Sequence, residues 1–317
     1  CSVYCVRHGM EVYREVKQME GGDVVPVTTV AYMALPLRAL SRAWGWANGL
    51  WMPGPLRRGV LRSYAWAFGC NMEEAERPLE DYANLGDFFT RRLRSGARPV
   101  CEEGLACPAD GRVVALGRVT ADTVIQVKGF QYQASALLGV DRGKVARLLD
   151  PRGERDLFHC TVYLAPGDYH GYHAPADMRV RQRLHVPGRM LSVSPAVLGR
   201  IPNLFAMNER IVLSASWEHG ELYYCPVAAT NVGNMSLTFE PTLATNLASQ
   251  SAHSPPSRVV LEEESPVQLS RGDLVGFFHL GSTVVLIFQA PRDFAFTVNV
   301  GEKVKMGQQL GAVSSSA

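Results

Sequence analysis

The chain has 317 residues, of which 47% are hydrophobic and 20% are charged, and its formal net charge is +2. This composition is typical of a folded globular protein, and the charge balance argues against a generally basic nucleic-acid-binding chain. The seven cysteines are irregularly spaced and form no CxxC pair, which argues against a zinc knuckle, a redox motif or a disulfide-built secreted protein.

The first part of the chain predicts helices. Because the sequence begins with Cys1, we expect a processed form or a fragment whose targeting peptide is not visible. Residues 26–52 combine apolar and tryptophan side chains with Arg38 and Arg42, which predicts an amphipathic helix. Such a helix either anchors the protein at a membrane interface or packs on the core, and the sequence favours neither. No run of 18 apolar residues occurs, so we expect no transmembrane helix.

Two further helices follow. Pro53 and Pro55 interrupt the first pattern, and residues 56–68 have the pattern of a second helix. Asn84 is a typical helix-capping residue, and the apolar residues at positions 85, 88, 89 and 93 predict a short amphipathic helix after it. The basic residues within 91–94 are best explained as a solvated helix face.

From about residue 105 the pattern becomes that of short strands. Runs rich in Val, Ile, Leu and Tyr alternate with Gly, Pro, Asn and Asp. Expected strands include 111–119, 160–164, 210–214, 235–239 and 283–288. The sequence therefore predicts an α+β fold, in which N-terminal amphipathic helices precede a β-rich catalytic core of antiparallel sheets with a barrel-like or sandwich-like arrangement.

Two segments in this β-rich part predict local structure but no chemistry. Residues 241–268 are rich in Ser, Pro and Glu, which predicts a mobile surface loop. Residues 300–311 resemble the turn sequence of lipoyl-like hammerhead barrels, in which glycines provide the backbone angles of a tight β-corner.

Asp110 is the first candidate for chemistry. It lies in Pro-Ala-Asp-Gly-Arg at 108–112, directly before an expected strand. Taken alone, this segment is better explained as a turn whose acid bonds its own backbone.

His170 and His173 form the second candidate site. They lie with Asp168 in a Pro- and Gly-rich loop, residues 165–175, that follows an expected strand. Catalytic groups are often held on such loops, and histidines exchange protons near neutral pH. Two hydrogen-bonded histidines without a catalytic role, or a metal site that lacks an obvious third ligand, remain alternatives.

The Gly281-Ser282 pair is the third candidate, at the entrance to a strand that looks buried. Gly281 has no side chain to shield its carbonyl, and its backbone can adopt strained angles. A strained turn would let the Ser282 hydroxyl approach that carbonyl. Taken alone, the pair is better explained as a plain turn into a strand.

In this order, these segments resemble the phosphatidylserine decarboxylase family, and its mitochondrial branch in particular. The resemblance runs from about Leu37 to Leu310. Six segments carry it: Pro-Ala-Asp-Gly-Arg at 108–112, Gln-Val-Lys-Gly at 126–129, Tyr-Leu-Ala-Pro-Gly-Asp-Tyr-His-Gly-Tyr-His-Ala-Pro at 163–175, Phe-Ala-Met-Asn-Glu-Arg at 205–210, Val-Ala-Ala-Thr-Asn-Val-Gly at 227–233 and Leu-Gly-Ser-Thr at 280–283. The last is the family's self-cleavage sequence.

The resemblance implies an enzyme that makes its own cofactor. Asp110 would support His173, His173 would take the Ser282 proton, and the Ser282 oxygen would attack the Gly281 carbonyl. Cleavage would leave a covalent pyruvoyl group at position 282.

The implied reaction converts phosphatidylserine to phosphatidylethanolamine and carbon dioxide, with the pyruvoyl group as the electron sink. His170 would protonate the carbon that has lost carbon dioxide. Lys128 would contact the phosphate or the carboxylate, although a solvated lysine is an equal alternative.

The resemblance also implies an organisation at a membrane. Residues 1–52 would form a membrane-proximal segment, and residues 53–317 a catalytic domain that is cut into a β chain (1–281) and an α chain (282–317). The two chains would stay associated, and a homodimer is expected, with phosphatidylserine in a membrane as the partner and no nucleic acid. By family analogy, the location would be the mitochondrial inner membrane, on its intermembrane-space side.

Three other functions remain open. A serine hydrolase could use Ser282, His173 and Asp110 on an external ester, although the Gly-x-Ser-x-Gly elbow is missing. A non-enzymatic carrier or binding module would fit the hammerhead-like tail, although the tail lacks a persuasive lysine for cofactor attachment. A zinc hydrolase could be built on His170 and His173.

Overall fold

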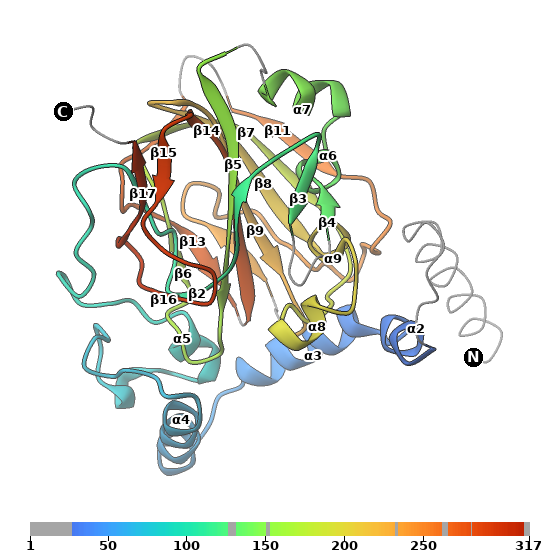
Figure 1. The fold of residues 1–317 in the computed structure, drawn as a ribbon. Helices are drawn as coiled ribbons and strands as arrows, with labels where there is room; N and C mark the ends of the chain where they lie inside the picture. The colour runs from blue at the N-terminus through green and yellow to red at the C-terminus, as the bar shows by residue number, and fades with distance from the viewer. Residues whose placement is uncertain are drawn as a thin grey trace.

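The structure is a computed structural model, and it describes residues 27–125, 131–149, 153–231, 234–261, 266–279 and 281–313. Lys128, one of the predicted binding residues, lies outside the described residues. Figure 1 shows a β-rich body with the N-terminal helices along one side. The predicted α+β fold, with antiparallel sheets behind N-terminal helices, is confirmed.

A nine-stranded antiparallel sheet forms the body of the molecule. Its order is β11-β7-β8-β9-β14-β5-β2-β16, and β12 also pairs with β7. The strands are β2 (Gly111–Arg118), β5 (Arg155–Leu164), β7 (Met178–Val186), β8 (Arg210–Trp217), β9 (Gly220–Ala228), β11 (Ser257–Val260), β12 (Val267–Leu269), β14 (Ser282–Pro291) and β16 (Lys303–Val304). The strand that begins at Ser282 therefore lies in the middle of the sheet, between β5 and β9.

Three smaller sheets complete the β structure. One has the order β10-β13-β6, a second β1-β17-β15, and a third pairs β3 with β4. Their strands are β1 (Leu105–Ala106), β3 (Thr123–Ile125), β4 (Gln131–Gln133), β6 (Gly171–His173), β10 (Met235–Leu237), β13 (Leu274–Phe278), β15 (Phe294–Phe296) and β17 (Gln309–Val313).

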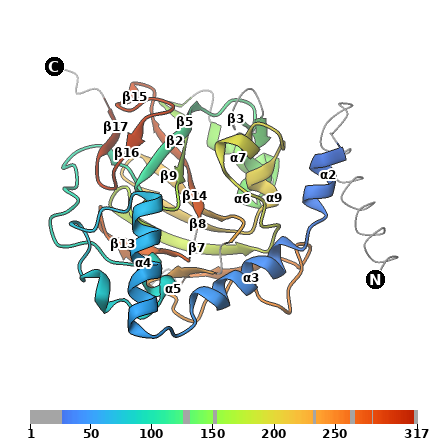
Figure 2. The same ribbon diagram turned by 90° about the horizontal axis from the view of Figure 1, so that it is seen from below.

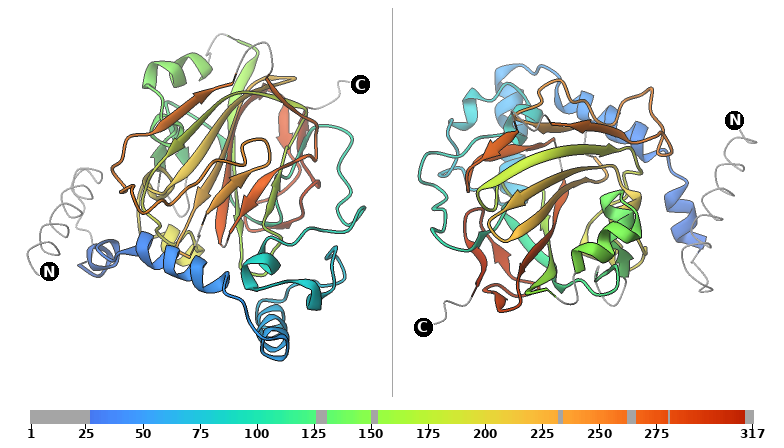
Figure 3. Two further views of the ribbon diagram at one scale, coloured as in Figure 1. Left: turned by 180° about the vertical axis from the view of Figure 1, so that it is seen from behind. Right: turned by 90° about the horizontal axis from the view of Figure 1, so that it is seen from above.

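The middle strands of the large sheet, β8, β9 and β14, are buried on both faces. On one face, Tyr172 of β6 packs against Tyr224 of β9, which brings the β10-β13-β6 sheet over the middle strands. On the other face, the Arg210 side chain donates to the Leu137 carbonyl of α6 (Ala134–Leu138). Figure 3 shows α6 and α7 (Arg142–Leu149) at this second face. Two covered faces explain why β14 reads as a continuous apolar run rather than an alternating one.

The predicted N-terminal helix is two helices, α2 (Val27–Met33) and α3 (Leu37–Asn48), because Pro36 separates them. The packing on the core is confirmed, whereas the role as a membrane anchor stays a prediction. Leu37 and Ser41 of α3 are buried against the body, while its tryptophans are largely exposed. The predicted second helix is α4 (Gly54–Phe68).

The short helix α5 (Leu85–Phe89) is confirmed, and its cap is the predicted one: the Asn84 side chain accepts a hydrogen bond from the Asp87 N–H at 2.9 Å. The helix ends at Phe89, before the last residue of the predicted stripe. The remaining helical segments are η1 (Leu79–Asp81), α8 (Pro195–Leu198) and α9 (Leu204–Met207).

The surface segment 241–268 has more order than its composition predicts. Within it, β11 pairs with β7 at the edge of the large sheet, from Ser257 opposite His185 to Val260 opposite Gln182. An edge strand offers unpaired backbone groups to any neighbouring extended segment, so a polar, breaker-rich segment can still be held by main-chain hydrogen bonds.

Candidate active site

Ser282 and His170 lie on two chain segments that pass between the large sheet and the β10-β13-β6 sheet. Ser282 pairs with Leu164 in the large sheet, and the Phe278 N–H donates to the His170 carbonyl at 3.1 Å beside the small one. Residues 165–170 and the segment that joins Phe278 to Ser282 therefore connect the same two sheets side by side. We call this region the corner.

Ser282 lies at the corner in a sealed position. It is fully buried, it pairs with Leu164 on one side and Ala228 on the other, and its Oγ atom has no hydrogen-bond partner among the described residues. Gly281, directly before it, has φ +32°, a left-handed value that favours glycine. A buried hydroxyl without a partner is costly, so such atoms often mark chemistry.

His170 is also sealed. Its side chain is fully buried, its ring centroid lies 4.1 Å from that of Phe89, and its Nδ1 lies 2.8 Å from the Asp168 carbonyl oxygen. Since a carbonyl only accepts, Nδ1 carries the proton and donates. Nε2 is buried and has no hydrogen-bond partner in the part of the chain that the structure describes. Burial lowers the pKa of His170 to about 3, so the ring is neutral and Nε2 holds an unused lone pair.

His173 differs from His170 in that both of its ring nitrogens have hydrogen-bond partners. Its Nδ1 donates to the Gly272 carbonyl at 2.8 Å, and its Nε2 accepts from the Tyr169 hydroxyl at 3.0 Å. Burial lowers the pKa of His173, while the Gly272 carbonyl and the negative charge of Asp110 work against that shift. Both ring nitrogens are therefore engaged, and the tautomer is fixed with the proton on Nδ1.

Asp110 is held by cations and a backbone amide. Arg98 donates to both of its oxygens, at 2.9 and 2.6 Å, the Met306 N–H donates at 2.9 Å, and Lys305 lies 3.4 Å away. Burial opposes ionisation, but the Arg98 and Met306 hydrogen bonds outweigh it and lower the pKa of Asp110. Asp110 is therefore a carboxylate at neutral pH.

The sequence matches the model of the phosphatidylserine decarboxylase family over residues 85–312. It is 39% identical to the mitochondrial phosphatidylserine decarboxylase proenzyme of Cricetulus griseus, over 96% of this chain and 80% of that protein. It is 35% identical to the mitochondrial phosphatidylserine decarboxylase proenzyme 1 of Saccharomyces cerevisiae, over 90% of this chain and 74% of that protein. The chain belongs to the phosphatidylserine decarboxylase family.

Membership of the phosphatidylserine decarboxylase family confirms the resemblance on which the sequence analysis relied, and with it an enzyme rather than a carrier module. The word proenzyme in the relatives' names agrees with a precursor that is cleaved. Among the described residues, no group of three or more His, Cys, Asp or Glu side chains could hold a metal ion.

The expected direct contact between Asp110 and His173 is not formed in this structure. The two residues are neighbours, since the His173 N–H donates to the Pro108 carbonyl at 2.7 Å. However, in the described part of the chain the carboxylate hydrogen-bonds Arg98, Met306 and Lys305, and the imidazole hydrogen-bonds Gly272 and Tyr169. The support that Asp110 gives His173 is thus electrostatic here.

Three residues that contact the candidate residues or their loop were not predicted from the sequence: Tyr169, Arg98 and Arg91. Arg91 was expected on a solvated face, but it is 2% exposed, and its Nη2 donates to the carbonyls of Gly167 and Asp168 at 2.9 and 3.2 Å. A signal was available, because Arg91 follows Phe88 by three residues and so continues the apolar stripe of the predicted helix.

Arg91 and α4 together fix the loop that carries His170. Arg91 and His170 donate to the same carbonyl, that of Asp168. Tyr64 of α4 donates to the Pro166 carbonyl at 2.9 Å. A Cβ atom at Gly167 would lie only 1.9 Å from the Phe68 carbonyl oxygen, so the loop touches the end of α4 and needs glycine there. These contacts fix the position of the loop relative to α4 and to Arg91.

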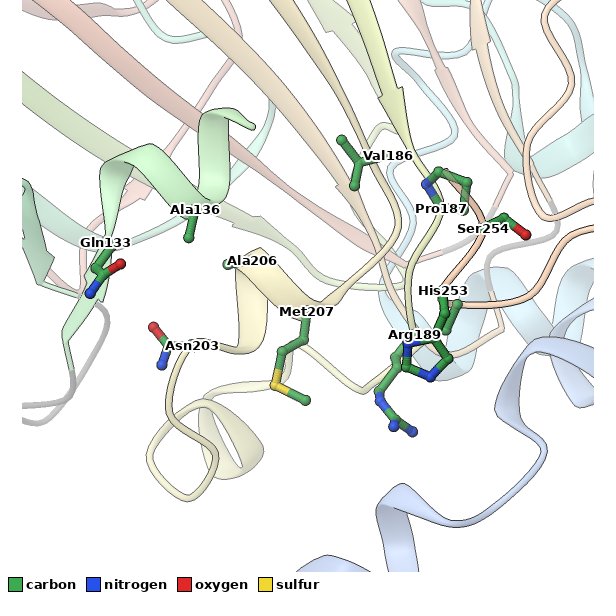
Figure 4. Close-up of a pocket in the computed structure, with 11 residues that line it drawn as sticks. Gln133, Ala136, Val186, Pro187, Arg189, Asn203, Ala206, Met207, His253 and Ser254 are labelled. Carbon is green, nitrogen blue, oxygen red and sulfur yellow. The ribbon is translucent and has the colours of Figure 1, made fainter. Parts of the chain in front are cut away.

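A separate cavity of about 610 Å³ opens between α6, α9 and the 252–254 segment. Figure 4 shows Arg189 and His253 close together at one end of it, with Gln133 and Asn203 toward the other. Asp110, His170, His173 and Ser282 are not among its described lining residues.

Proposed function

We propose that this chain converts phosphatidylserine to phosphatidylethanolamine and carbon dioxide after it cuts itself between Gly281 and Ser282. The observation that carries the proposal is the sealed, unpartnered Ser282 hydroxyl that follows a left-handed glycine at the corner. The relatives named above are phosphatidylserine decarboxylase proenzymes, which supports the same reaction. Cleavage would give a β chain of residues 1–281 and an α chain of residues 282–317.

Self-cleavage requires a base for the Ser282 hydroxyl, and His173 is our candidate. The Tyr169 hydroxyl occupies its Nε2, so we infer that the proton reaches Nε2 through that hydroxyl. Burial raises the pKa of Tyr169, which keeps the hydroxyl protonated and able to give one proton while it takes another.

The Ser282 oxygen then attacks the Gly281 carbonyl, the His173 imidazolium, which Asp110 stabilises, returns its proton to the departing Ser282 nitrogen, and an ester replaces the peptide bond. Loss of the Ser282 α-proton expels the Gly281 carboxylate, which separates the two chains. The dehydroalanine left at position 282 tautomerises and is hydrolysed with release of ammonia, which gives the pyruvoyl group.

A pyruvoyl group at position 282 would supply the electron sink that decarboxylation needs. The site fits such a group, because Ser282 is the first residue of a buried central strand and its Oγ atom has no competing partner. Neutral His170 can accept a proton at Nε2 from the substrate's ammonium group, which makes the amine nucleophilic. The same Nε2 can later return the proton to the α-carbon.

The N-terminal helices offer a surface for the membrane that holds the substrate. Figure 2 shows α3 and α4 on the same side of the sheets. The three most exposed tryptophans lie on these helices or between them: Trp46 of α3 is 70% exposed, Trp51 in the connecting segment 77%, and Trp66 of α4 86%. Exposed tryptophans with nearby arginines are typical of interfacial anchors. Among the described residues, no helix combines the length and hydrophobicity needed to cross a membrane.

We further propose that residues 1–52 form the membrane-proximal segment and residues 53–317 the catalytic domain. The relatives' names give a mitochondrial location for those proteins, and we extend this to the intermembrane-space side of the inner membrane. A homodimer belongs to the same proposal. Liposome flotation tests the membrane role: loss of binding when residues 26–52 are deleted supports it, and unchanged binding contradicts it.

The intact mass of the purified protein tests the function. We expect two chains, and the small one should begin with a pyruvoyl group in place of Ser282. The variant Ser282→Ala should remain one chain and release no carbon dioxide from phosphatidylserine. An active wild-type preparation that contains a single chain with an ordinary serine at position 282 would instead support the serine hydrolase.

A further inference from the structure

A groove runs along one face of α3, between this helix and the 246–254 segment. It begins in the cavity of Figure 4 and continues into a second cavity of about 410 Å³, and the two share Arg189, Ala252 and His253. Arg42 joins the second cavity to a third of about 350 Å³, which His279 also lines. The third cavity is therefore lined by a residue that lies three positions before Ser282 in the sequence.

The lining of this groove is basic and apolar. None of the described residues that line the three cavities is acidic. Arg42 and Arg189 lie at its junctions, and Met33, Leu35 and Leu191 provide apolar walls. Arg38 also lines it, but Arg38 forms an ion pair with the buried Glu209. Such a mixed lining suits an anionic group attached to an apolar body.

Arg42 has the most capacity for a ligand. It is half-buried, and in the described part of the chain its side chain makes one hydrogen bond, to Asn246 Oδ1 at 3.3 Å. A guanidinium carries five N–H donors in a planar fork that matches the oxygens of a phosphate. Several donors therefore remain to face the groove.

The wall of the groove leads directly to the cleavage site. Met190, which lines the second cavity, accepts a hydrogen bond from Thr230 Oγ1 at 2.6 Å. A Cβ atom at Gly281 would lie 3.8 Å from the Thr230 carbonyl oxygen. One residue thus separates the groove wall from Gly281. Ser41 of α3 accepts from the Asn231 N–H at 3.0 Å, which holds the helix against this wall.

We propose that this groove is the entry path of the phospholipid substrate and that Arg42 binds its phosphodiester. The proposal deepens the proposed function and rests on it. The phosphate would lie at Arg42 while the serine headgroup reaches past His279 toward position 282, and the glycerol end would face Leu35 and the exposed side of α3. The 246–254 segment, whose composition suggested only a mobile loop, then forms the outer wall of the substrate path.

The test measures steady-state kinetics with dihexanoylphosphatidylserine below its micelle concentration, so that no membrane surface contributes. Arg42→Gln should raise KM by about tenfold or more, because it removes a charged hydrogen bond, and should leave self-cleavage unchanged. Arg42→Lys keeps the charge but loses the planar fork of N–H donors, so its KM should lie between those of the wild type and Arg42→Gln. The matched control Arg58→Gln removes an exposed arginine from α4 and should leave KM unchanged.

Competition experiments identify the chemical group. Dihexanoylphosphatidylcholine shares the phosphodiester and should inhibit the wild type competitively but inhibit Arg42→Gln much less. An unchanged KM in Arg42→Gln, an equal rise in Arg58→Gln, or equal inhibition by phosphate-free dihexanoylglycerol would overturn the proposal. A wild-type protein that is not cleaved into two chains, or that releases no carbon dioxide from phosphatidylserine, would instead contradict the proposed function.

Discussion

His170 and His173 lie three residues apart on one loop, yet their surroundings differ completely. His170 packs under Phe89 and leaves Nε2 without a partner, whereas His173 engages both ring nitrogens, one with Gly272 and one with Tyr169. Burial lowers the pKa of both histidines, to about 3 at His170, and the charge of Asp110 opposes that shift at each of them. The difference teaches that neighbouring histidines can be prepared for different steps by what packs on them.

We assign the two environments to two reactions. A histidine that is already hydrogen-bonded and lies in the field of a carboxylate suits a proton transfer that creates an imidazolium, as self-cleavage requires. A neutral histidine with an unused lone pair in a sealed pocket suits proton exchange with a bound substrate. Each of the following changes tests this division.

The largest effect is expected for His173→Ala. Removing the base should slow self-cleavage by at least about 100-fold, the ordinary contribution of a general base. The conversion of one chain into two is followed over time on denaturing gels. A variant that is cleaved at the wild-type rate would remove His173 from the cleavage reaction.

His170→Ala should have the opposite effect, because it should impair decarboxylation and not self-cleavage. We expect this variant to be cleaved normally, but its release of carbon dioxide from phosphatidylserine should fall by at least about 100-fold. Mass analysis of the small chain confirms that cleavage is complete before activity is measured. Efficient decarboxylation by this variant would contradict the assigned role of His170.

Tyr169→Phe tests the inferred proton path to His173. Loss of the hydroxyl should slow self-cleavage by about tenfold, since one hydrogen bond on the path is lost. Decarboxylation by the chains that have been cleaved should remain close to normal. Faster cleavage would show that the hydroxyl blocks Nε2 rather than relaying the proton.

Arg91→Met tests whether the Asp168 carbonyl positions His170. Without Arg91, that carbonyl and the Gly167 carbonyl lose a buried donor. We expect kcat to fall by roughly threefold to tenfold at unchanged KM, and Arg91→Lys to restore part of the loss. Arg92→Met, at the exposed neighbouring position, is the matched control and should behave as the wild type.

The smallest effect is a pH dependence of stability. His170 has its pKa lowered to about 3 in the folded state, against an ordinary value of about 6.5. The unfolded chain therefore binds a proton that the folded chain does not, and the free energy of unfolding falls as the pH drops from about 6.5 toward 3. At pH 5 the free energy of unfolding should be lower by roughly 2 kcal/mol for this reason.

Chemical denaturation at pH 7 and pH 5 measures this effect in the uncleaved Ser282→Ala background. The free energy of unfolding should fall less between these two pH values in Ser282→Ala with His170→Gln than in Ser282→Ala alone. Equal losses in the two proteins would show that the pKa of His170 is not depressed.

The sequence by itself determined the local elements and the order of the reactive segments. The cap at Asn84, the end of the first helical pattern before Pro53 and the strands around residues 111–118 and 282–291 follow from short-range geometry, which spacing and residue type report. The candidate residues themselves were recognisable because glycine, serine and histidine occur there in family-like segments.

Only the tertiary structure decided the partners of those residues. Asp110 bonds Met306, 196 positions away, and His173 bonds Gly272, 99 positions away. No local pattern encodes such contacts, because they depend on which strands become neighbours in the sheets. Arg91 is an intermediate case: its spacing from Phe88 indicates the buried side of the predicted helix, but only the fold brings the Gly167 and Asp168 carbonyls to its side chain.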